Sequence, residues 1–202
     1  PEFLNKRDSF LFKMYQAFGH HFDFIAIPII KKRLRMNTSQ VIINEARPQL
    51  TKHLAIRAKE KIGQNVNLLG EVVLGNGEAD HRYHQYLKAL ESPDINYISV
   101  KISGIYAQTH ALNYEESFPE LISRMSALYQ KAIDFPYTDE EGVRRSKFIN
   151  LDMEEYKDTH FTLRLFKTVL SLPQFKNYSA GIVVQAYLPD AYDFQTELIE
   201  FA

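Results

Sequence analysis

Four polar side chains stand at equivalent places in four short apolar segments, and their chemistry suits the binding of a charged substrate. They comprise two carboxylates, an ammonium and an amide, namely Glu71, Asp152, Lys101 and Gln185. A lysine is a compact cation that binds carboxylate or phosphate groups, and neighbouring acids orient it. Because a lone buried charge is costly, Lys101 requires an acidic partner or a solvated, ligand-lined opening. Asp152 and Glu71 are the expected partners.

Side chains alternate along a β-strand, so residue parity decides which of them share a face. In YISVKIS, residues 97–103, Lys101 falls on the face opposite Val100 and its apolar neighbours. The same division recurs in NVNLLGE (65–71), FINLDME (148–154) and IVVQAYL (182–188). For one residue, a structural lysine–carboxylate pair explains the pattern equally well. Four polar groups of one parity, each toward the carboxyl end of its segment, favour a site.

These segments are interpreted as strands of a parallel sheet, because a helical stretch follows each one. Strands and helices alternate at intervals of roughly 30 to 50 residues, which is typical of successive βα units. The expected helices are residues 77–91, 116–134, 158–172 and 191–202. FPYTDEEGVRRS interrupts the second interval and predicts a loop, since it combines Pro, Gly and charges.

The first part of the chain has a different pattern, with apolar residues returning every three or four positions from about residue 7 to 62. This spacing predicts helices, and Gly63 is the expected C-cap of the last one. The chain therefore divides into a helical arm, residues 1–62, and an α/β domain, residues 63–202. KKRLR, residues 31–35, fits either a solvated helix end or peripheral contact with a membrane surface.

The amino-acid composition is that of an ordinary globular protein, with 202 residues and a formal net charge of -1. Such a charge gives no general attraction for nucleic acid, so no nucleic-acid partner is expected. The lack of cysteine rules out disulfides and a cysteine nucleophile, and it fits a reducing, cytoplasmic compartment. We expect neither a signal peptide nor a bilayer-spanning segment, because no stretch has the required pattern or apolar length.

Two other groups of residues have the chemistry of metal ligands. His81 and His84 lie three positions apart on an expected helix, but surface histidines explain them better, since no third ligand follows at a recognisable spacing. The acids of DMEEYKD, residues 152–158, could hold Mg²⁺, although the helix dipole alone favours acids near a helix N-terminus. No phosphate-binding loop or nucleophile elbow occurs. We expect no metal in the site.

Four motifs, in order, resemble those of the proline dehydrogenase family, including the proline dehydrogenase domain of bifunctional proline utilisation enzymes. They are NVNLLGEVVLGNGEADHRY, YISVKISGIYAQ, FINLDMEEYKD and GIVVQAYLPDA, and the similarity runs from about Val41 to the last residue. The resemblance implies a distorted (βα)8 TIM-type barrel that holds FAD at its carboxyl-terminal mouth and oxidises L-proline to Δ1-pyrroline-5-carboxylate. It also implies hydride transfer to flavin N5 and delivery of the electrons to a membrane quinone.

The resemblance further implies a role for each residue of the expected site. Lys101 would bind the substrate carboxylate, and Glu71 would hold Lys101 in place. Asp152 would lie at both flavin and substrate and orient the cationic groups. Gln185 would hydrogen-bond the isoalloxazine edge, whereas Met153 would contact the flavin through its backbone, since its side chain has the parity of the apolar face.

Four of the eight strands of such a barrel are recognisable, and the arginine pair that binds the substrate carboxylate in the family is missing. The chain is thus expected to be the first half of the barrel behind a helical arm, a fragment that does not turn over proline alone. Two alternatives stay open. One is a non-catalytic interaction module that forms a homo-oligomer through its arm, and the other is a divalent-metal barrel enzyme.

Overall fold

The computed structural model describes residues 9–10, 13, 15–16, 23–38, 42–43, 47–69, 75–107 and 114–202. The chain consists of two units, Pro1–His53 and Leu54–Ala202. Helix α2 (Asp23–Thr38) lies in the first unit, and α3 (Arg47–Lys59) begins there and ends in the second. Within the described residues, no helix combines the length and the apolar character that crossing a membrane requires.

Helix α3 ends in a Schellman motif that is built without glycine. Lys61 takes the left-handed conformation, with φ of 58°. Its N–H donates to the Ala58 carbonyl at 3.0 Å, and the Ile62 N–H donates to the Arg57 carbonyl at 3.0 Å. These two bonds satisfy carbonyls that the helix end would otherwise leave open. The expectation that Gly63 caps the helix is therefore wrong.

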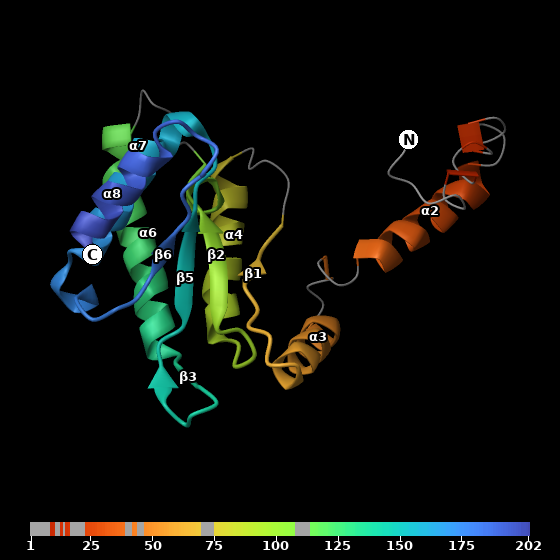
Figure 1. Cartoon of the computed structure of the whole chain (residues 1–202), viewed down its shortest axis with the longest axis horizontal. Coiled ribbons are helices and arrows are strands. Elements are labelled where there is room, and N and C mark those ends of the chain that lie inside the picture. The colour runs from red at the N-terminus through yellow and green to blue at the C-terminus, as the bar shows by residue number, and fades with distance from the viewer. Residues whose placement is uncertain are drawn as a thin grey trace. The chain divides into compact units, whose positions relative to one another are not determined.

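Four parallel strands form the sheet of the second unit, in the order β1–β2–β5–β6 (Figure 1). They are β1 (Val66–Asn67), β2 (Tyr97–Lys101), β5 (Phe148–Asp152) and β6 (Gly181–Ile182). Each strand pairs in parallel with the next strand of the four. The prediction of a parallel sheet made from successive βα units is confirmed.

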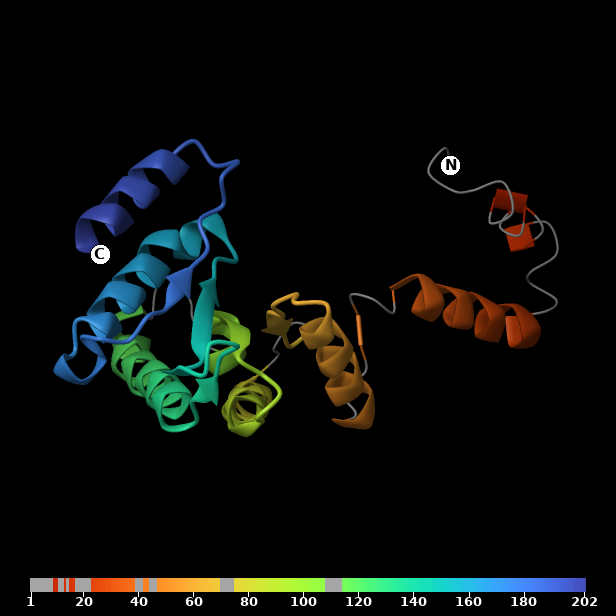
Figure 2. The ribbon, with the colours of Figure 1, turned by 60° about the horizontal axis from the view of Figure 1, so that its bottom comes forward.

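The helices that follow these strands lie along one face of the sheet (Figures 1 and 2). They are α4 (Asn76–Glu91), α6 (Tyr114–Asp134), α7 (Thr159–Leu170) and α8 (Ala191–Phe201), and their bounds agree with the expected helices within two residues. The apolar strand residues Ile98, Val100, Ile149 and Leu151 are fully buried on this face. Burial of each contributes about 1.5–3 kcal/mol, so these residues anchor the sheet to its helices.

The strands are shorter than the sequence predicts, because the backbone turns as soon as each reaches its carboxyl end. Strand β2 stops at Lys101, and the next residues form α5 (Ile102–Ile105), so Ser103 is not part of the strand. Strand β6 contains two residues, where residues 182–188 were expected. One further bond, from the Val183 N–H to the Leu151 carbonyl, continues the pairing, and Gln185 then lies in the connecting segment.

The predicted loop between α6 and β5 is in fact a β-hairpin. Its antiparallel strands are β3 (Tyr137–Thr138) and β4 (Arg144–Arg145). Asp139 organises the turn, since its Oδ1 accepts the backbone N–H groups of Glu141 and Val143 at 3.0 and 2.8 Å. Gly142 supplies the left-handed residue, with φ of 80°. The Pro, Gly and charges of this segment are turn chemistry rather than a sign of irregular chain.

Candidate functional site

Lys101 and Asp152 meet at the carboxyl ends of neighbouring strands. They are register partners across β2 and β5, so both side chains leave the sheet on the same face, as their parity predicted. Two amides hold the Asp152 carboxylate: Asn150 Nδ2 donates to Oδ1 at 3.1 Å, and Asn67 Nδ2 donates to Oδ2 at 3.3 Å. The aspartate is thus fixed by neutral donors from β1 and β5.

Glu154, rather than Asp152, is the ion-pair partner of Lys101 among the described residues. The distance from Lys101 Nζ to Glu154 Oε1 is 3.7 Å. Glu71, the other expected partner, lies outside the described residues. The strand pattern had already given Glu154 the right position, two residues after Asp152 and of the same parity. The interpretation of the acidic run as a metal or helix-dipole feature obscured this role.

Glu154 also connects the other segments at this end of the sheet. Its Oε2 accepts the backbone N–H of Ser103 at 3.3 Å, and its carbonyl oxygen accepts Gln185 Nε2 at 3.1 Å. Gln185 therefore lies beside the Lys101 pair, although it belongs to the segment after β6. Met153 has the opposite orientation: its side chain is buried in a cluster with Leu163 and Phe194, as its parity predicted.

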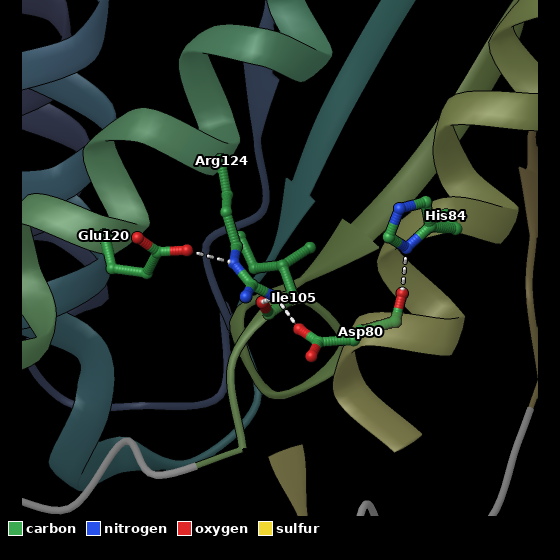
Figure 3. A network of polar contacts seen from close by, with 5 residues as sticks. All are labelled: Asp80, His84, Ile105, Glu120 and Arg124. Carbon is green, nitrogen blue, oxygen red and sulfur yellow. Dashed lines mark hydrogen bonds and ion pairs between the residues drawn. The ribbon is translucent and has the colours of Figure 1, made fainter. Parts of the chain in front are cut away.

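An arginine outside the site fixes the segment that follows Lys101 (Figure 3). Arg124, on α6, donates to the Ile105 carbonyl at 2.9 Å and to Glu120 at 2.7 Å, and it pairs with Asp80 of α4 at 2.6 Å. Its guanidinium also lies 5.1 Å from the centre of the Tyr83 ring. These contacts tie the end of α5 to two helices, which limits the movement of the backbone next to Lys101.

A tyrosine packs directly beneath the same segment. Tyr86, on α4, is 1% exposed, and burial raises the pKa of its hydroxyl to about 12. The hydroxyl therefore remains protonated at neutral pH. A Cβ at Gly104 would lie 3.0 Å from the Tyr86 oxygen, so a larger residue there would require the Tyr86 and Arg82 side chains to shift by a few tenths of an ångström.

The candidate metal ligands are not gathered into a cation site. Within the described part of the chain, no three His, Asp or Glu side chains are placed to hold a metal ion. His84 Nδ1 contacts the Asp80 carbonyl at 2.6 Å, one helical turn away on α4. In the acidic run, Glu155 pairs with Lys157 at 2.8 Å, and Asp158 accepts the Tyr114 hydroxyl. His84, Glu155 and Asp158 thus make structural contacts within the chain.

Comparison with known proteins connects this geometry to one family. The family model for proline dehydrogenase matches residues 50–202. Proline utilization A (PutA) from Corynebacterium freiburgense is 37% identical, with a TM-score of 0.74 over 84% of this chain and 17% of that one. PutA from Bdellovibrio bacteriovorus, solved after inactivation by N-propargylglycine, is 27% identical, with a TM-score of 0.69 over 88% of this chain and 20% of that one. The chain thus spans no more than a fifth of either relative. No curated protein matches the chain.

Proposed function

The chain belongs to the proline dehydrogenase family, and from that premise we propose that the protein carrying it oxidises L-proline to Δ1-pyrroline-5-carboxylate with FAD as cofactor. The observation that supports this most directly is that Lys101 and Asp152 lie opposite each other in register at the carboxyl ends of β2 and β5. A cation and an anion side by side match the carboxylate and the ring nitrogen of a zwitterionic amino acid.

Lys101 is the residue we assign to the substrate carboxylate. Its side chain is 38% exposed, and no hydrogen bond joins its Nζ to another described residue. The ammonium can therefore donate to an incoming anion without first losing a protein partner. Asp152 is assigned to the side of the substrate nitrogen, where its amide-held carboxylate orients the cationic group. We assign Glu71 to the support of Lys101.

The residues around Gln185 fit a flavin. One Gln185 N–H donates to the Glu154 carbonyl, and no other described residue is bonded to the second N–H or to Oε1, which could bind the edge of a ring. The Met153 side chain is occupied in the core, so its backbone is the part available beside Asp152. When bound, FAD would supply the acceptor for the hydride and the two electrons that proline loses. Gln185, the Met153 backbone and Asp152 are the groups proposed to hold it.

The architecture we propose is the first half of a (βα)8 TIM-type barrel, residues 63–202, behind a helical arm, residues 1–62. Four parallel strands with helices on one face are what the first four βα units of such a barrel would provide. The proposed electron acceptor is a quinone, reached by peripheral membrane contact from the cytoplasm. These last points, and a homo-oligomeric state, rest on the family resemblance and the sequence alone.

The decisive experiment uses the full-length protein that contains this chain. We expect it to purify with the absorption spectrum of a bound flavin, and we expect proline to bleach that spectrum in the absence of oxygen. Addition of a dye acceptor should then give continuous turnover. A colourless protein, or a flavin-loaded protein that proline does not reduce, would reject the proposal.

A further inference from the structure

Glu154 contacts three separate segments of the candidate site, two through its carboxylate and one through its backbone. It is paired with Lys101 at the end of β2, accepts the Ser103 N–H at the start of α5, and accepts Gln185 through its carbonyl. The carboxylate makes the first two contacts, and the backbone makes the third. A change of the side chain can therefore alter the lysine without removing the contact to Gln185.

The distance between Glu154 and Lys101 determines what the pair can do. At 3.7 Å the two charges attract, yet the separation exceeds the 2.7–3.2 Å of a hydrogen bond. The acid thus restrains the ammonium but takes none of its three donors. Lysine has a flexible four-carbon stem, and its 38% exposed side chain would otherwise sample several rotamers.

We propose that Glu154 is a positioning residue that directs the Lys101 ammonium toward the substrate carboxylate. This inference rests on the proposed function, because it takes the anion bound by Lys101 to be the carboxylate of the substrate. Glu154 acts before substrate arrives, since the restrained lysine loses less rotamer freedom when it binds the anion. It has no contact with the reacting atoms.

The adjacent acid provides a matched control. Glu155 is 64% exposed and pairs with Lys157 at 2.8 Å rather than with Lys101. Glu154→Gln and Glu155→Gln therefore remove the same charge one residue apart. In Glu154→Gln the amide oxygen still accepts the Ser103 N–H, and the backbone still holds Gln185. Flavin content and melting temperature should match those of the wild type.

The measurement is steady-state oxidation of proline by the full-length flavoprotein. For Glu154→Gln we expect KM to rise about fivefold, the effect of losing a partly exposed ion pair of about 1 kcal/mol, with kcat changed less than twofold. Glu155→Gln should leave both constants unchanged. In a Lys101→Ala background, Glu154→Gln should have no further effect on KM, since the two residues act as one unit.

Two outcomes would overturn the inference. In the first, Glu154→Gln leaves KM unchanged or lowers it relative to the wild type. In the second, Glu154→Gln raises KM in the Lys101→Ala background as much as it does in the wild type. A second measurement distinguishes failure of this inference from failure of the proposed function. It is calorimetric binding of the proline analogue in which oxygen replaces the ring nitrogen. A wild type that binds the analogue but does not oxidise proline rejects the function. The affinities of the two glutamine variants for the analogue then decide the role of Glu154, and a wild type that binds no analogue rejects both proposals.

Discussion

Lys101 and Asp152 are register partners on adjacent parallel strands, and each is the last residue of its strand. The two charges therefore lie on the same face and at the same height of the sheet. They have different partners, because Glu154 pairs with the lysine and two asparagine amides hold the aspartate. Lys101 and Asp152 are thus not bonded to each other, as the proposed binding of a zwitterion between them requires.

Removal of the Lys101 ammonium should weaken substrate binding far more than folding. For Lys101→Ala we expect the dissociation constant for proline to rise about tenfold to a hundredfold, since a charged hydrogen bond contributes about 1.5–3 kcal/mol. Titration of the flavin spectrum with proline would measure this constant. Lys157→Ala, which breaks an exposed pair with Glu155, is the control. Equal losses in the two variants would contradict the assignment.

Gly181 should not tolerate a side chain. A Cβ there would lie 2.5 Å from Asn150 Oδ1 and 2.9 Å from the Phe148 ring. Gly181→Ala should lower the free energy of unfolding by about 1–3 kcal/mol through overpacking. It should also weaken proline binding, because displaced Asn150 no longer holds Asp152. Thermal unfolding of Gly63→Ala, where nothing lies within 4 Å, gives the baseline, and a similar melting temperature for both variants would refute the prediction.

A buried lysine should make stability depend on alkaline pH. Lys147 is 2% exposed, and burial lowers the pKa of its ammonium from the ordinary 10.5. Between the lowered folded pKa and 10.5 the unfolded chain binds more protons than the folded chain, so the free energy of unfolding should rise with pH across this window. Below the window the penalty for the buried charge is fully present.

Chemical unfolding across that pH range, in the wild type and in Lys147→Met, isolates the contribution of Lys147. The free energy of unfolding should rise less with pH in Lys147→Met than in the wild type, because the titration of Lys147 no longer contributes. Lys88→Met changes an exposed lysine and should keep the slope of the wild type. Identical slopes in all three proteins would show that Lys147 does not carry the dependence.

Arg124 should not be replaceable by lysine. Its guanidinium donates to Glu120 and Ile105 and pairs with Asp80, and its side chain is 18% exposed. A single ammonium cannot reproduce this planar set of donors, so Arg124→Lys should cost about 1–3 kcal/mol of stability. Arg145→Lys, in the exposed hairpin, should cost less than about 0.5 kcal/mol. Denaturant midpoints compare the two, and an unperturbed Arg124→Lys would argue against the network.

Strand parity predicted that Lys101 and Asp152 share one face of the sheet, because a parallel sheet offers few alternatives. Once Val100 and Leu151 are assigned to the buried face, Lys101 and Asp152 must share the other. The helices were equally accessible to prediction, since α6 buries Leu121, Met125 and Leu128 at the spacing of a helical face.

The positions that the sequence did not predict depend on local geometry near the ends of strands and helices. Whether Lys101 pairs with Asp152 or with Glu154 depends on how the backbone turns after β5. The spacing of apolar residues in the sequence does not specify that turn. The cap at Lys61 is similar, because a lysine in a left-handed conformation has no sequence signal, whereas nearby Gly63 has one. The length of β6 also depends on contacts with its neighbour rather than on its own apolar run.

The β3–β4 hairpin joins the end of α6 to the start of β5, which places it at the amino end of the strands, away from Lys101 and Asp152 (Figure 1). Extra residues at its exposed tip, Glu140–Glu141, would therefore lengthen the protein without reaching the carboxyl ends of the strands. That tip is a suitable attachment point for a fluorophore or an affinity tag, because the proposed site lies at the opposite rim of the sheet.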